Sequence, residues 1–148
     1  MDYFRTPFQT LASGIDSLPE ILSHIGATKV MLVVDTSFPY LSIREKVAQM
    51  AVPYIVFDHF GSNPLYEDVC LGVNSFNEER CDAIVAVGGG STIDVAKCIK
   101  LYCHMDPATN YLRQEAADSG IPLVAIPTTA GTGSESTRFA VIYYDGKK

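Results

Sequence analysis

The sequence contains the run Ile84-Val-Ala-Val-Gly-Gly-Gly-Ser-Thr-Ile-Asp-Val-Ala-Lys97, in which a short apolar strand leads through three glycines into an amphipathic helix. Glycine lets the backbone approach a bulky anion closely, because it has no Cβ. The N–H groups at the start of a helix and the positive end of its dipole favour a phosphate. The run therefore predicts a loop that binds a nucleotide or a sugar phosphate.

A second interpretation of the same run remains open. Ser91 and Asp94 have the spacing of a capping box, in which two side chains satisfy backbone groups at the start of a helix. The three consecutive glycines before them favour the phosphate loop. The run is neither GxGxxG nor a P-loop, because no Gly-Lys-Ser/Thr follows, so its spacing does not favour an ordinary Rossmann loop or an NTPase.

Apolar runs alternate with helical patterns along the whole chain. This alternation predicts βαβ crossovers and an α/β fold with a mainly parallel sheet that is buried on both faces. An extended stretch precedes the first helix. In α/β folds with a parallel sheet, ligands bind at the carboxyl ends of the strands. Strands are expected at residues 30–34, 54–57, 83–87, 123–126 and 139–143, and helices at residues 15–25, 43–50, 66–80 and 91–103.

Composition narrows the class of protein. A chain of 148 residues suits one domain, and its net charge of −6 argues against nucleic acid as a partner. No apolar run is long enough to span a bilayer, and no signal peptide is visible. None of the four cysteines forms a CxxC pair, which predicts reduced thiols and a cytoplasmic location. The histidines have no metal-ligand spacing.

Three further features follow predicted strands. Residues 127–137, Pro-Thr-Thr-Ala-Gly-Thr-Gly-Ser-Glu-Ser-Thr, follow the strand at 123–126, and their hydroxyls and glycines are suited to a ribose, a phosphate or a nicotinamide amide. Asp35 follows the first parallel strand, where an acid accepts the hydroxyls of an adenosine ribose and repels a 2′-phosphate; a helix cap or turn is the alternative. Asn63-Pro64 after the second strand is by itself weak evidence.

Taken together, two of these motifs resemble the iron-containing (group III) alcohol dehydrogenase family. They are Gly88-Gly-Gly-Ser-Thr-Ile-Asp94 with Ala96-Lys97, and Ile126-Pro-Thr-Thr-Ala-Gly-Thr-Gly-Ser-Glu135. Asn63-Pro64 and Cys81-Asp-Ala-Ile84 also fit, so the resemblance extends from about Lys29 onward. The resemblance implies a Rossmann-like cofactor-binding domain, here residues 1–148, followed in the family by an all-helical domain that holds iron or zinc through an aspartate and three histidines. We expect that helical domain to be absent from this chain.

The resemblance also implies roles for individual residues. Gly89, Gly90 and Ser91 would hold the pyrophosphate, and Asp94 would lie near the nicotinamide. Asp35 matches the acid that favours NAD over NADP, so NADP is the less expected cofactor. The other expected contacts are Asn63, a lining formed by Thr128, Thr129 and Thr132, the pair Phe139 and Val141 against the nicotinamide, and Lys148 at the ribose. No catalytic or metal-binding residue of the family falls within the chain.

The implied activity is hydride transfer between NAD(P) and an alcohol, aldehyde or ketone, with a metal in the full-length enzyme and no turnover by this part alone. The expected partners are a small-molecule alcohol or aldehyde and, as an open alternative, a second copy in a homodimer; nucleic acid and membranes are not expected. Two alternatives remain. One is a non-catalytic nucleotide-binding module, and the other is a glycerol dehydrogenase-like or phosphonoacetaldehyde reductase-like relative.

Overall fold

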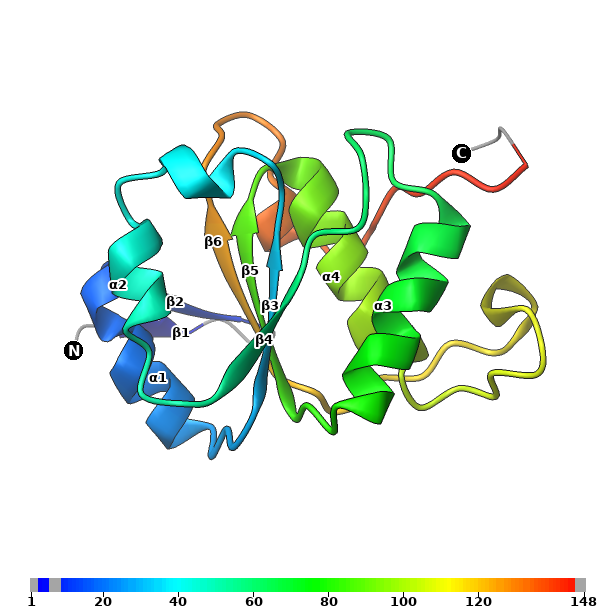
Figure 1. Cartoon of the computed structure of the whole chain (residues 1–148), viewed down its shortest axis with the longest axis horizontal. Helices are drawn as coiled ribbons and strands as arrows, with labels where there is room; N and C mark the ends of the chain where they lie inside the picture. Colours follow the sequence, from blue (N-terminus) through cyan, green and yellow to red (C-terminus); the bar gives the residue numbers. More distant parts are fainter. Residues whose placement is uncertain (1–2, 6–8, 146–148) are drawn as a thin grey trace.

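The computed structural model describes residues 3–5 and 9–145. Within these residues a four-stranded parallel sheet lies between two layers of helices, and a short antiparallel hairpin lies beside it (Figure 1). The strands are β1 (Tyr3–Arg5), β2 (Thr10–Ala12), β3 (Val30–Val34), β4 (Tyr54–Phe57), β5 (Ala83–Gly88) and β6 (Leu123–Pro127). The helices are α1 (Leu18–His24), α2 (Arg44–Ala48), α3 (Tyr66–Glu78) and α4 (Gly90–Tyr102), with single 3-10 turns at Ile15–Ser17, Phe38–Tyr40, Tyr111–Arg113 and Ser134–Ser136.

The central strands β3 and β5 are buried on both faces, as their uninterrupted apolar sequences predict. Alternate side chains enter two separate cores. Leu32 and Val85 face α1 and α2, where Leu22 and Val47 pack against them. Met31 and Ile84, and the residue two positions after each of them, face α3 and α4. Figure 1 shows α1 and α2 on one side of the sheet and α3 and α4 on the other.

The strand order is β4-β3-β5-β6, and every neighbouring pair in this sheet is parallel. The chain moves outward from β3 to β4, then crosses back over β3 to β5 and continues to β6. Right-handed crossovers then require α2 on one face and α3 and α4 on the other. The reversal creates a topological switch point between the carboxyl ends of β3 and β5, where ligands of doubly wound sheets bind.

Four strands of the predicted parallel sheet are confirmed within one or two residues, and the Rossmann-like fold class is confirmed with them. The predicted strand at residues 139–143 is wrong. This segment is extended, but it passes α4 and reaches the start of α3, where it makes one isolated parallel bridge between Tyr143 and Leu65. Its period-two alternation is real, because Ala140, Ile142 and Tyr144 pack on the α3–α4 core while the residues between them do not.

The capping box, which was the alternative interpretation of the glycine run, does not form at α4. The helix begins one residue earlier than expected, with Gly89 in the N-cap position. Ser91 is therefore inside the first turn, and its Oγ donates to the backbone carbonyl of Ser62 at 2.6 Å. Asp94 bonds to a different segment, as described below. Neither side chain returns to the helix backbone, because each has a tertiary partner.

No helix among the described residues has both the length and the apolar character needed to cross a membrane. The four cysteines are unpaired thiols. Three of them, Cys81, Cys98 and Cys103, are buried in the core on the α3–α4 side of the sheet.

Candidate functional site

The carboxyl edge of the sheet gathers most of the predicted site residues. Asp35 follows β3, the loop at residues 58–65 with Asn63 follows β4, the glycine loop (residues 88–91) follows β5, and the threonine loop (residues 127–137) follows β6. All four loops lie at one edge because the four strands are parallel. The last of these loops arches over this edge in Figure 1. Sequence segments separated by up to a hundred residues thus meet at the switch point.

Asp35 connects the first strand to the glycine loop. Its Oδ2 accepts a hydrogen bond from Thr92 Oγ1 at 2.9 Å, and Thr92 is completely buried in the first turn of α4. Gly88 lies directly under this bond: a Cβ on Gly88 would lie 2.5 Å from Thr92 Oγ1 and 2.9 Å from Asp35 Oδ2. Only glycine therefore fits at residue 88.

The carboxylate of Asp35 is held in its ionised form. Burial on its own raises the pKa of Asp35, but hydrogen bonds from the Ser37 hydroxyl and N–H, from the Thr92 hydroxyl and from the Gly89 N–H outweigh burial and lower that pKa overall. The Ser37 N–H bond, at 2.8 Å to Oδ1, is a local turn, so the turn interpretation is confirmed. The result is a half-buried negative charge beside the glycine loop.

The glycine loop and the threonine loop pack tightly against each other. Thr128 N–H donates to the Gly88 carbonyl at 2.9 Å, which extends the pairing of β5 and β6 into the loops. A Cβ on Gly89 would lie 3.2 Å from Thr129 Oγ1, and one on Gly90 would lie 3.2 Å from Thr132 Cγ2. The room that these glycines provide is therefore filled by threonine side chains, so a phosphate at this loop would also meet those side chains.

The loop after β4 closes the same edge from the other side. The Ser91–Ser62 hydrogen bond holds this loop against the start of α4. Asn63 is the next residue and is exposed. Pro64 is buried, and its carbonyl accepts from Tyr143 N–H at 2.9 Å, so the end of the described chain also fixes this loop. Asn63 and Ser91 are thus brought together, as predicted for one site.

Asp94 contacts the residues that follow the threonine loop. Its Oδ1 accepts from Ser134 Oγ at 2.6 Å and its Oδ2 accepts from Val141 N–H at 3.0 Å. Lys97, one turn further along α4, donates to the Phe139 carbonyl at 2.7 Å and to Ser134 Oγ at 3.1 Å. The side chains of Phe139 and Val141 are 71% and 49% exposed. The predicted nicotinamide contacts therefore lie at the surface on an anchored segment.

Sequence reasoning missed Gly88, Thr92, Lys97 and Ser134 as site residues. Thr92 and Ser134 are the only two buried polar side chains in the described core, and the hydroxyl of each donates a hydrogen bond to a carboxylate from another segment. The sequence contained one signal, since both residues belong to the two motifs that the family resemblance quoted. Lys148, expected at the ribose, lies outside the described residues.

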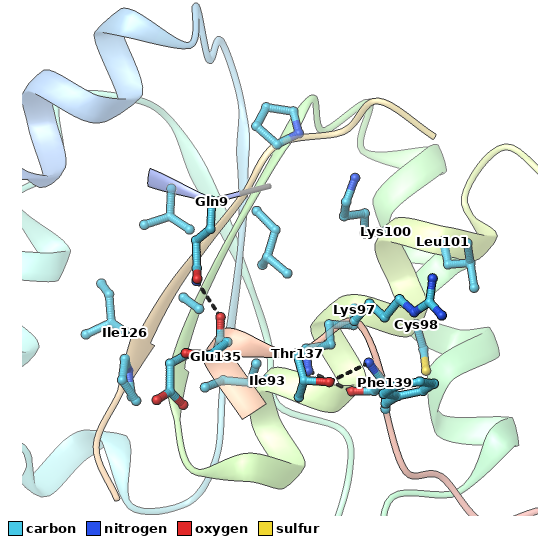
Figure 2. Close-up of a pocket in the computed structure, with 18 of the residues that line it drawn as sticks. Gln9, Ile93, Lys97, Cys98, Lys100, Leu101, Ile126, Glu135, Thr137 and Phe139 are labelled. Atoms are coloured by element: carbon cyan, nitrogen blue, oxygen red, sulfur yellow. Dashed lines mark hydrogen bonds between the residues drawn. The ribbon is translucent and has the colours of Figure 1, made fainter. Parts of the chain in front are cut away.

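An open trough of 1940 Å³ runs along the free side of β6. It is lined by β6 itself, α1, β2, the outer side of α4 and residues 135–145, with Ile93 and Ile126 among the apolar contributors (Figure 2). Among the described strands, only β5 pairs with β6, so its other edge is unpaired within this part of the chain. The last residues of the threonine loop, 135–137, also line this trough.

Across residues 3–5 and 9–145, no group of three or more His, Cys, Asp and Glu side chains is arranged to hold a metal ion. The polar groups gathered around the glycine loop include hydroxyls, backbone N–H groups, the Asn63 amide and the ionised carboxylate of Asp35. This donor set fits a nucleotide with a ribose and phosphates, because it supplies donors for phosphate oxygens and an acceptor for sugar hydroxyls.

Comparison with known proteins adds decisive information. The sequence pattern described as "Iron-containing alcohol dehydrogenase" matches residues 11–148. This chain belongs to the iron-containing alcohol dehydrogenase family. The family is one of oxidoreductases, and the resemblance of the two loop motifs is thereby confirmed.

Individual relatives agree with the family assignment. The chain is 34% identical to a 4-hydroxybutyrate dehydrogenase of Cupriavidus necator, over 99% of this chain and 41% of that protein. It is also 34% identical to an NAD-dependent methanol dehydrogenase of Bacillus methanolicus, over 99% of this chain and 40% of that protein. The chain thus spans about two fifths of the length of these relatives.

Solved structures agree as well. A 1,3-propanediol oxidoreductase superposes with a TM-score of 0.72 at 29% identity, over 84% of this chain and 34% of that one. A sulfoacetaldehyde reductase from Bifidobacterium kashiwanohense, solved in complex with NAD⁺, superposes with a TM-score of 0.72 at 27% identity, over 86% of this chain and 35% of that one. The sheet and its helices are therefore the fold of the corresponding part of these dehydrogenases.

Proposed function

We propose that this chain binds NAD and forms the cofactor-binding part of an NAD-dependent oxidoreductase that interconverts an alcohol and an aldehyde or ketone. The observation that carries the proposal is the ionised Asp35 carboxylate, held by Thr92 and Gly89 at the switch point next to the glycine loop. Relatives named for NAD, a methanol dehydrogenase and a reductase in complex with NAD⁺, support the choice of cofactor.

The order of the loops along the sheet edge supports one orientation of the dinucleotide. The adenosine ribose lies by Asp35 and Asn63, the pyrophosphate lies at Gly89, Gly90 and Ser91, and the nicotinamide half lies beyond β6. There Thr128, Thr129 and Thr132 line the cofactor, Phe139 and Val141 support the ring, and Lys148 is the proposed ribose contact. The start of α4 supplies N–H groups that have no acceptor within the helix, and these suit the pyrophosphate charge.

Asp35 accepts the ribose by exchanging one of its present donors. Four hydrogen bonds reach its two oxygens, and a carboxylate has about four acceptor positions. Ser37 supplies the most replaceable bond, because its hydroxyl is exposed and rotates freely. The ribose hydroxyl would take its place, while Thr92 and Gly89 keep the carboxylate oriented. A 2′-phosphate would bring a second negative charge to the same position, and NADP would therefore bind more weakly.

When bound, NAD supplies a nicotinamide carbon that accepts or donates a hydride. The described residues bind and orient the cofactor; they contain no group that we assign to the chemistry of the substrate. We place the metal-holding residues and most of the substrate pocket in a further part of a longer protein. The share of the relatives that this chain spans supports this division, and so does the open trough beside β6. The free thiols support a reducing, cytoplasmic location.

A comparison of NAD with NADP tests the cofactor assignment. We expect calorimetric titration to show that NAD binds at least about tenfold more tightly than NADP, since one close like-charge contact costs on the order of 1.4 kcal/mol or more. Asp35→Gly should remove most of that difference. Asp118→Gly is the matched control, because Asp118 is an exposed acid at the opposite edge of the sheet. An unchanged preference in Asp35→Gly would reduce Asp35 to a turn residue.

A non-catalytic nucleotide-binding module remains the second candidate, because the described residues support binding but not turnover. We expect the chain alone to bind NAD without producing NADH from short alcohols. Adding a separately produced remainder of the longer protein should restore turnover if the chain is part of an enzyme. Turnover by the chain alone would contradict the proposed division, and binding with no restored turnover would favour the module.

A further inference from the structure

Asp94 and Lys97 form a nearly buried pair of opposite charges on α4. Their side chains are 14% and 13% exposed. Taking two charges out of water is costly unless each is well satisfied by partners. The pair itself does not satisfy them, because the Lys97 Nζ is 3.5 Å from the Asp94 carboxylate, longer than any other bond that either group makes.

The closer partners all belong to residues 134–141. Lys97 Nζ lies 2.7 Å from the Phe139 carbonyl and 3.1 Å from Ser134 Oγ. Asp94 accepts from Ser134 Oγ at 2.6 Å and from Val141 N–H at 3.0 Å. The two charges thus bond to the backbone of this segment at Phe139 and Val141, and to the Ser134 side chain at its start.

The segment carries two apolar side chains outward. Val141 donates its N–H to Asp94 and Phe139 offers its carbonyl to Lys97, yet both side chains are exposed large hydrophobics. Phe139 N–H in turn donates to Thr137 Oγ1 at 3.1 Å, which fixes the turn before it. Figure 2 shows Lys97, Thr137 and Phe139 joined by these bonds at the wall of the trough.

We propose that Asp94 and Lys97 are positioning residues for the nicotinamide half of the cofactor. They fix the backbone of residues 134–141, so that Phe139 and Val141 form a rigid apolar support for the nicotinamide ring. This inference rests on the proposed binding of NAD. It differs from a direct contact of Asp94 with the nicotinamide, in that Asp94 acts through its hydrogen bonds to the 134–141 segment.

This arrangement predicts a split between two ligands. ADP-ribose has the adenosine and pyrophosphate of NAD but lacks the nicotinamide ring. Loosening the 134–141 segment should weaken NAD binding and leave ADP-ribose binding unchanged, since Asp35 and the glycine loop are held by other contacts. General destabilisation of the fold would instead weaken both ligands together.

The test is calorimetric titration of Lys97→Met with NAD and with ADP-ribose. Loss of charge-assisted bonds to the segment should weaken NAD by roughly tenfold. The Kd for ADP-ribose should stay within about twofold of wild type. Lys100→Met is the matched control, because Lys100 lies one turn further along α4 and pairs only with the exposed Asp118 in the described contacts. It should change neither Kd.

Ser134→Ala provides an independent variant in case Lys97→Met does not fold. Ser134 is buried and bonds to both charges, and removing its hydroxyl is a smaller change than removing a charge. It should also weaken NAD selectively. Equal weakening of NAD and ADP-ribose, or no change for NAD in either variant, would overturn the positioning role while leaving the proposed function intact. If the wild-type chain binds neither ligand, the proposed function itself fails, and this inference fails with it.

Discussion

Gly88→Ala tests the packing on which the site is built. The added methyl would lie 2.5 Å from Thr92 Oγ1, 2.7 Å from Thr92 Cβ and 2.9 Å from Asp35 Oδ2. Thr92 is completely buried in the first turn of α4, so it has little freedom to move away. Forcing a methyl into a packed site costs about 1–3 kcal/mol. The displaced Thr92 hydroxyl also loses its bond to a charged acceptor, worth about 1.5–3 kcal/mol before the partial exposure of Asp35 is considered.

We therefore expect Gly88→Ala to lower the free energy of unfolding by about 3 kcal/mol, which corresponds to a fall in Tm of roughly 6–12 °C for a chain of this size. Urea unfolding followed by circular dichroism measures this change. Gly61→Ala is the matched control, because a Cβ on the exposed Gly61 meets no atom within 4 Å. It should change the stability by less than about 0.5 kcal/mol.

A double-variant cycle tests the mechanism of that loss. Thr92→Val removes the hydroxyl at nearly constant shape and should cost about 1–2 kcal/mol. Because Gly88→Ala breaks the same hydrogen bond, the combined variant should lose less than the sum, by about 1 kcal/mol. Additive losses, or a cost of less than about 1 kcal/mol for Gly88→Ala alone, would refute the proposed contact between residues 35, 88 and 92.

Three further predictions concern charge, thiols and backbone. Because hydrogen bonds lower the pKa of Asp35 below its ordinary value of 3.8, its contribution to stability is complete above that value and is lost as the pH falls through the lowered pKa. Asp35→Asn should flatten the pH dependence of Tm below about pH 4, and an unchanged slope would contradict this. Burial raises the pKa of Cys98 to about 12 and that of Cys81 to about 11, so both thiols should react slowly with a thiol reagent at neutral pH until urea unfolds the chain. Equal rates in the folded and unfolded chain would contradict their burial. Gly133 has a φ of 62° with open space around its Cβ position, so Gly133→Ala should cost about 1 kcal/mol in urea unfolding from backbone strain alone, and a neutral result would contradict the left-handed turn.

The parallel sheet was predictable from the sequence because its two central strands are buried on both faces. Val30–Val34 and Ala83–Gly88 are short, uninterrupted apolar runs between helical patterns, and this signal depends only on local residues. The strand order was not predicted. It depends on the pairing of β3 with β5, which joins residues far apart in the sequence, such as Val30 and Ala83.

The segment at residues 139–143 was predicted as a strand for a sound local reason, since the partly buried Ala140 and Ile142 alternate with the exposed Phe139 and Val141. The pattern fixes an extended backbone but not its hydrogen-bond partner. Here charged side chains of α4 satisfy the backbone of Phe139 and Val141, and the sequence separations are 42 and 47 residues. Local periodicity contains no information about such a partner.

The residues of the candidate site likewise fall into those that the sequence predicted and those that it did not. Asp35 and the glycine loop were identified because they follow predicted strands, and strand ends share one edge of a parallel sheet. The family resemblance then assigned Gly89 and Ser91 to the pyrophosphate. Thr92 was missed because its importance comes from Asp35, which is 57 residues away. Ser134 was missed for the same reason, since its partner Asp94 is 40 residues away.

The most direct test of the account is an amide NMR titration of the chain with NAD. The account predicts saturable shifts confined to the carboxyl edge of the sheet, at residues 35–37, 62–63, 88–92 and 128–132, and at residues 134–141 beyond β6. Amides at the opposite edge, such as those of residues 118–120, should not move. Absence of saturable binding, or shifts centred on that opposite edge, would contradict the claim that this chain holds NAD at the switch point of its sheet.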